Sequence, residues 1–150
     1  RVAEHGGGVS FFRLETLNEP AGLWDAFEGA DYVVHTAMAV PSMVQSKSPL
    51  FDVEKDLMNP AVGGTRAVMA AARKCGVRRV VLTSSMVAVC GTQRAGDSHH
   101  VWTEADWNDE MAIPYSRAKT TAERAAWDYV AEHGGPELVV VNPSLTLGPI

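Results

Sequence analysis

Four short apolar runs along the chain predict β-strands. The runs are Val9–Phe12, Asp31–Thr36, Arg79–Thr83 and Leu138–Val141. In the last three, apolar residues occupy consecutive positions instead of alternating with polar ones. Such continuous runs are typical of a parallel sheet whose faces are both covered by helices.

Helical patterns separate the predicted strands, and a proline near the start or a glycine at the end marks several of their bounds. The predicted helices run from Pro20 to Glu28, from Ser48-Pro49, from Asn59-Pro60 to Gly76 and from Pro114 to Gly134. Asn59 is expected to cap the third of these helices. Alternating strands and helices predict right-handed βαβ units in an α/β fold with a doubly wound, Rossmann-like parallel sheet.

The composition excludes several classes of partner without naming a function. A net charge of −5 with no basic run argues against nucleic acid. No apolar stretch approaches the ~20 residues that a membrane span needs, so no membrane partner is expected. Cys75 and Cys90 make no disulfide framework, which favours the cytoplasm.

One long segment, residues 86–113, separates a predicted strand from a predicted helix. Connections beyond about 15 residues are usually functional or disordered, and two tryptophans in this one favour a functional role. His99 and His100 also lie here, close to Cys90, but adjacent histidines on an irregular loop lack the usual spacing of metal ligands. No metal site is predicted.

Polar residues stand at the carboxyl ends of three of the predicted strands. They are His35-Thr36, Thr83-Ser84-Ser85 and Asn142-Pro143-Ser144. Because ligands of doubly wound sheets bind outside the carboxyl ends of the strands, these positions form a candidate binding edge.

The strongest candidate for chemistry is the pair Tyr115 and Lys119, spaced i, i+4 on the predicted helix. This spacing places the phenol and the ammonium on one helical face. A nearby cation favours the phenolate form of a tyrosine, which can then exchange a proton with a substrate oxygen. With a hydroxyl from Ser85, the set suits carbonyl reduction or its reverse. Since none of these groups supplies a hydride, the hydride must come from a cofactor.

Several stretches together resemble the extended short-chain dehydrogenase/reductases, also described as the NAD-dependent epimerase/dehydratase family. The stretches are Asp31–Ala37, Asn59–Thr65, Arg79–Ser85, Tyr115-x-x-x-Lys119 and Asn142–Pro149. Trp102–Asn108 and Ala122–Trp127 are more similar to the branch that contains dihydroflavonol 4-reductase, cinnamoyl-CoA reductase and methylglyoxal reductase. The motifs occur in the family's order along nearly the whole chain.

The resemblance implies a role for each matching residue. Tyr115 would be the general acid and base, Lys119 would hold the nicotinamide ribose and tune Tyr115, and Ser85 would orient the substrate carbonyl. The residues implied to lie beside the cofactor are Thr36, Ala37, Ser84, Tyr115, Lys119, Pro143 and Ser144. The resemblance further implies a small carbonyl or alcohol substrate, favours NADP(H) over NAD(H), and suggests a homodimer, which is common in this family.

The chain also departs from the family pattern. The family opens with a strand and a glycine-rich turn, but Gly6-Gly7-Gly8 precedes a predicted strand instead of following one. We therefore expect residues 1–150 to be the central and C-terminal part of a dinucleotide-binding domain, without its glycine-rich start or the substrate-binding part. Thr16-Leu17 stands where relatives often carry Asp-Leu near the adenine.

Two other functions stay open on the sequence alone. The same residues would serve a nucleotide-sugar epimerase or dehydratase, which keeps its cofactor between turnovers. A non-catalytic protein that senses a dinucleotide and binds a partner is the alternative outside the enzymes, although such a sensor has no need of an acid like Tyr115.

Overall fold

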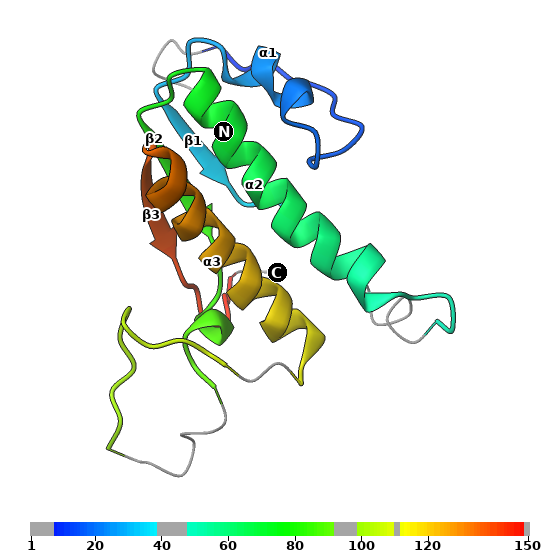
Figure 1. Ribbon diagram of the computed structural model, residues 1–150, viewed down its shortest axis with the longest axis vertical. Helices are drawn as coiled ribbons and strands as arrows, with labels where there is room; N and C mark the ends of the chain where they lie inside the picture. Colours follow the sequence, from blue (N-terminus) through cyan, green and yellow to red (C-terminus); the bar gives the residue numbers. More distant parts are fainter. Residues whose placement is uncertain (1–7, 39–47, 92–98, 110–111, 149–150) are drawn as a thin grey trace.

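The computed structural model describes residues 8–38, 48–91, 99–109 and 112–148 (Figure 1). Its sheet has three parallel strands in the order β1-β2-β3, and they are β1 (Tyr32–His35), β2 (Arg79–Thr83) and β3 (Glu137–Val141). In their register, Val33, Val80 and Leu138 stand side by side, and the other positions follow in step. The carboxyl ends of all three strands therefore lie at one edge of the sheet.

Two long helices pack against each other on one face of this sheet (Figure 1). They are α2 (Asn59–Lys74) and α3 (Pro114–His133). The shorter elements are η1 (Pro20–Leu23), α1 (Trp24–Phe27), η3 (Glu54–Met58) and η4 (Met86–Ala88). None of the helices in the described ranges is long and apolar enough to cross a membrane.

The main core lies between this face of the sheet and the two helices. Its buried side chains come from the short N-terminal helices, α2, β2, α3 and β3, and they include Leu23, Met69, Val80, Ala126 and Leu138. Alternate strand residues point to the other face, where Val34 is 65 % exposed and Val141 is 47 % exposed. Among the described residues, helices thus cover one face of the sheet.

The strand predicted over Val9–Phe12 is wrong, because these residues have no regular secondary structure. Phe11 is 94 % exposed, and no described strand pairs with this segment to satisfy its backbone. Leu14 and Leu17 pack against the core instead. Apolar composition alone therefore did not distinguish a strand from an exposed segment.

The predicted helix Pro20–Glu28 forms as two short pieces, η1 and α1. The helix expected from Ser48-Pro49 begins later, because residues 48–50 form a turn. At the start of this helix, the side chains of Asp52 and Asp56 both accept hydrogen bonds from backbone N–H groups. The Lys55 N–H donates to Asp52 Oδ1 at 2.9 Å, and the Asp52 N–H donates to Asp56 Oδ2 at 2.9 Å.

Asn59 is not the N-cap that the sequence predicted. It lies inside a continuous helix, where η3 runs directly into α2. The Asn59 N–H donates to the Glu54 carbonyl, five residues back, in a π-helical turn. This wider turn accommodates Pro60, which lacks an N–H and would crowd the carbonyl four residues before it.

The later bounds agree with the sequence. β2 is confirmed at both ends, and α3 ends before Gly134, as expected. Gly76 and Gly134 take left-handed conformations after α2 and α3, with φ of 70° and 74°. Gly6, Gly7 and parts of the 86–113 segment, namely 92–98 and 110–111, lie outside the described residues.

Candidate active site

The polar strand ends predicted from the sequence meet at one edge of the sheet. Beyond β2 and β3 the pairing continues, since the Ser84 N–H donates to the Val141 carbonyl at 2.9 Å and the Met86 N–H donates to the Pro143 carbonyl at 3.0 Å. His35 ends the neighbouring strand β1. The segments after β2 and β3 therefore stay paired, and together with the end of β1 they form the rim of the site.

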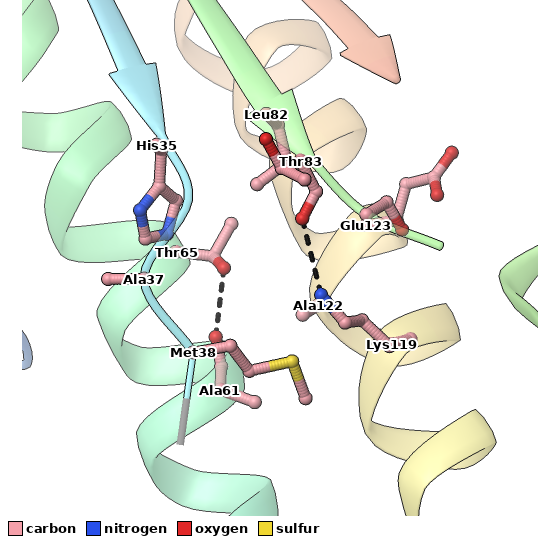
Figure 2. Close-up of a pocket in the computed structure, with 11 residues that line it drawn as sticks. His35, Ala37, Met38, Ala61, Thr65, Leu82, Thr83, Lys119, Ala122 and Glu123 are labelled. Atoms are coloured by element: carbon pink, nitrogen blue, oxygen red, sulfur yellow. Dashed lines mark hydrogen bonds between the residues drawn. The ribbon is translucent and has the colours of Figure 1, made fainter. Parts of the chain in front are cut away.

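Lys119 reaches this rim from α3. Its side chain is only 8 % exposed, and Nζ donates a hydrogen bond to the Thr83 carbonyl at 3.2 Å, as Figure 2 shows. Nζ also lies 6.0 Å from the centre of the Tyr115 ring. The structure thus brings the phenol and the ammonium together at the carboxyl end of β2, beside the segment that carries Ser85.

Contacts with η3 and α2 fix the position of α3, the helix that carries Tyr115 and Lys119. Ala118 and Ala122 are buried against Leu57 and Ala61, which belong to η3 and α2. Small side chains here let the helices approach closely. Arg117, two residues after Tyr115, pairs with Glu54 and ties the first turns of α3 to η3.

A cavity of about 20 Å³ lies between the ends of β1 and β2 and the two long helices (Figure 2). That volume holds about one water-sized group. Its polar lining residues are His35, Thr65, Thr83, Ser84, Lys119 and Glu123. The Ser84 hydroxyl is buried here without a hydrogen-bond partner among the described residues.

Burial controls the charge of the two basic groups that line this cavity. It lowers the pKa of Lys119, while the negative charge of Glu123 acts in the opposite direction. Burial also lowers the pKa of His35 to about 4, and the positive charge of Lys119 adds to that effect. His35 is therefore neutral near pH 7, so that Lys119 faces no second cation.

Ser85 lies next to Ser84 at the start of η4. Its hydroxyl accepts a weak hydrogen bond of 3.4 Å from the Val87 N–H and so acts as the N-cap of that turn. A hydroxyl that accepts there keeps its own O–H free to donate to another group. Because α3 packs against η4, this hydroxyl is on the segment that faces the helix with Tyr115 and Lys119.

The other residues that the sequence predicted to contact the cofactor also lie on this rim, and they differ in how exposed they are. Thr36 and Ala37 follow β1 and are exposed, and Ala37 lines the cavity. After β3, Pro143 is half-buried and Ser144 is exposed. These four residues lie on the segments that extend the strands, so a ligand along the rim can reach them.

The sequence assigned no role to Glu123, and it placed Asn142 only within the candidate binding edge. Glu123 is 5 % exposed and lies on the face of α3 that carries Lys119. The side chain of Asn142 donates to Glu123 Oε2 at 2.9 Å. The sequence does hold a signal for Glu123, because Tyr115, Lys119 and Glu123 repeat at intervals of four residues on one helix.

The described part of the long segment is held against η4 and α3. The Asn108 side chain donates to the Val87 carbonyl at 2.7 Å, and Arg124 of α3 stacks on Trp107 at 4.8 Å. His100 Nε2 lies 3.2 Å from Asp106 Oδ1. Burial and the charge of Asp106 raise the pKa of Cys90, which disfavours the thiolate that a metal would need. No group of three metal-ligating side chains is found within the described ranges.

The chemistry of this rim fits a nicotinamide cofactor. An ammonium has three N–H donors, and the Thr83 carbonyl takes one of those on Lys119. The others suit the hydroxyls of a ribose. The buried Ser84 hydroxyl offers a further polar contact, and Thr36 and Ala37 are exposed after β1.

Comparison with known proteins identifies the family. The model of the NAD dependent epimerase/dehydratase family matches residues 3–150. Cinnamoyl-CoA reductase 1 of Arabidopsis thaliana is 36% identical over 137 residues, and dihydroflavonol 4-reductase of the same plant is 36% identical over 143 residues. Each alignment covers 89% of this chain. The aligned part is 37% of the cinnamoyl-CoA reductase and 35% of the dihydroflavonol 4-reductase.

A solved structure gives the same result. Yeast methylglyoxal/isovaleraldehyde reductase Gre2, complexed with NADPH, superposes with a TM-score of 0.70 at 27% identity. The match covers 85% of this chain and 41% of that one, so the chain spans less than half the length of these relatives. The parallel sheet and the family match agree. The chain belongs to the NAD dependent epimerase/dehydratase family, the extended short-chain dehydrogenase/reductases.

Proposed function

We propose that the full-length protein is an NAD(P)H-dependent reductase of an aldehyde or ketone, with Tyr115 as its general acid. The observation that carries this proposal is the position of Lys119. Its ammonium is buried at the carboxyl end of β2 and lies 6.0 Å from the Tyr115 ring. The family membership and the resemblance to three reductases support the same reaction class.

Each residue has a distinct task in the proposed mechanism. The Ser85 hydroxyl donates a hydrogen bond to the substrate carbonyl and orients it. Tyr115 gives its phenolic proton to the same oxygen as the carbonyl carbon is reduced, and general acid catalysis of this kind contributes ~10²–10⁴ in rate. Lys119 holds the ribose hydroxyls and favours the phenolate that remains on Tyr115. A bound reduced nicotinamide supplies the hydride.

NADP(H) is the proposed cofactor, since the similar yeast reductase Gre2 forms a complex with NADPH. A homodimer and a cytoplasmic location remain predictions from the sequence. The substrate is a small carbonyl compound or the matching alcohol.

A spectrophotometric screen tests the reaction class. The purified full-length protein is mixed with NADPH or NADH and a panel of aldehydes and ketones, and the absorbance of the reduced nicotinamide is followed. We expect oxidation that depends on a carbonyl substrate. Cofactor binding without any carbonyl-dependent oxidation would overturn the proposal and favour a non-catalytic dinucleotide sensor.

One alternative is favoured by a specific observation. The matching family is named for epimerases and dehydratases, and such an enzyme would use the same residues. Such an enzyme retains its cofactor between turnovers. The nucleotide released when the purified protein is denatured separates the two cases, because retained NAD favours an epimerase and an exchangeable NADPH favours the reductase.

A further inference from the structure

A buried carboxylate lies within the rim of the site. Glu123 is 5 % exposed and is one of the residues that line the same cavity as Lys119 (Figure 2). A carboxylate in such a place is costly unless hydrogen bonds and a nearby cation compensate for lost water. Glu123 has both kinds of partner, because Asn142 donates to Oε2 at 2.9 Å and its charge acts on Lys119.

The partner that donates to Glu123 also binds the segment after β2. Nδ2 of Asn142 donates to the Ser85 carbonyl at 3.1 Å in addition to its bond with Glu123. Asn142 is the first residue after β3. One amide group therefore connects three elements, namely α3, the end of β2 and the end of β3.

The hydrogen bonds around Ser85 determine where its hydroxyl lies. The residues on either side of it, Ser84 and Met86, donate through the backbone to the β3 side of the rim. The Ser85 carbonyl accepts from the Asn142 side chain. These bonds fix the peptide planes around Ser85, so they also set the direction in which its side chain leaves the backbone.

We propose that Glu123 is a positioning residue, which through Asn142 fixes the Ser85 backbone relative to the helix that carries Tyr115 and Lys119. The role rests on the proposed reductase function, since Ser85 must orient a carbonyl for its position to matter. Glu123 itself touches no reacting atom. Its carboxylate orients the Asn142 amide, and the amide in turn holds the Ser85 carbonyl.

Kinetics of variants of the full-length protein test this role. Glu123→Ala removes the acceptor, and Asn142→Ala removes the donor. Each is expected to lower kcat by about 10-fold to 100-fold, the cost of a misplaced group in an active site. The KM for the carbonyl substrate and the Kd for NADPH stay at the wild-type values. Glu123→Gln recovers most of the lost kcat, because its amide oxygen accepts the same hydrogen bond.

A double variant distinguishes positioning from general damage. Because both residues act through one chain of bonds, Glu123→Ala/Asn142→Ala loses no more kcat than either single variant. Losses that multiply would overturn the role, as would a wild-type kcat in the single variants or a change confined to KM. If Glu123→Ala does not fold, Asn142→Ala is compared with Glu123→Gln/Asn142→Ala by the same criterion.

Glu132→Gln is the matched control, since it makes the same change on the same helix at an exposed side chain. It should behave as wild type in every assay. A wild-type protein that reduces no carbonyl compound would overturn the proposed function and this role with it. An active wild type with unaffected Glu123 and Asn142 variants would overturn the role of Glu123 alone.

Discussion

His35 and Lys119 are two basic side chains buried in one small cavity. Lys119 is 8 % exposed and His35 is 7 % exposed. Two cations buried so close together would repel each other. Burial lowers the pKa of His35 to about 4, so His35 is the group that stays uncharged. Neutral His35 leaves the cavity with one cation, which Glu123 balances.

This arrangement predicts that acid destabilises the fold through His35. The folded pKa of about 4 lies below the ordinary value of 6.5, so between these two values the unfolded chain binds more protons. Stability is therefore lost as the pH falls through this window, by up to about 3 kcal/mol. In urea unfolding at about pH 7 and about pH 4.5, His35→Gln should lose roughly 2 kcal/mol less than wild type on acidification.

His133→Gln is the control for this measurement, because the His133 side chain is 40% exposed at the end of α3. It should lose as much stability on acidification as wild type does. If His35→Gln loses as much as wild type as well, then His35 is not kept neutral by the fold.

At the scale of elements, the site depends on how irregular segments are attached to regular ones. The described part of the 86–113 segment is fixed to η4 by Asn108, which is 4% exposed. Its side chain donates to the Val87 carbonyl at 2.7 Å, and its N–H donates to the Ala88 carbonyl at 2.9 Å. The segment thereby holds the turn that follows Ser85.

Asn108→Ala should therefore destabilise the protein. The change leaves the Val87 carbonyl without its side-chain donor in a half-buried place, which costs about 1–3 kcal/mol. The measurement is the free energy of unfolding in urea. Asn18→Ala, a change at an exposed asparagine, should leave that free energy unchanged. Equal stability of Asn108→Ala and wild type would show that the segment does not depend on this bond.

The sequence predicted some elements well and others poorly, for physical reasons. The bounds of β2 could be predicted from a continuous apolar run, and those of α3 from Pro114 and Gly134. The start of the helix before α2 could not, because Ser48-Pro49 and the Asp52 carboxylate are both plausible starts. The π-helical turn at Asn59 was missed because it depends on how Pro60 is accommodated within a longer helix.

At the scale of the whole molecule, the parallel order of the strands creates the site. Three polar strand ends, separated in sequence by dozens of residues, meet at one edge because all three strands point the same way. That meeting could be predicted from the sequence, as could the pair of Tyr115 and Lys119. The network of Glu123 and Asn142 could not, since it depends on which side chains the packing of α3 directs toward the rim.

The central claim is that the Tyr115 phenol donates the proton in carbonyl reduction. The most direct test is the turnover of Tyr115→Phe in the full-length protein, with NADPH affinity measured alongside. Tyr129→Phe, on the same helix but stacked on His133, is the matched control and should keep wild-type turnover. We predict that Tyr115→Phe loses about 10²-fold or more of kcat while its Kd for NADPH is unchanged. Wild-type turnover in Tyr115→Phe would contradict the account.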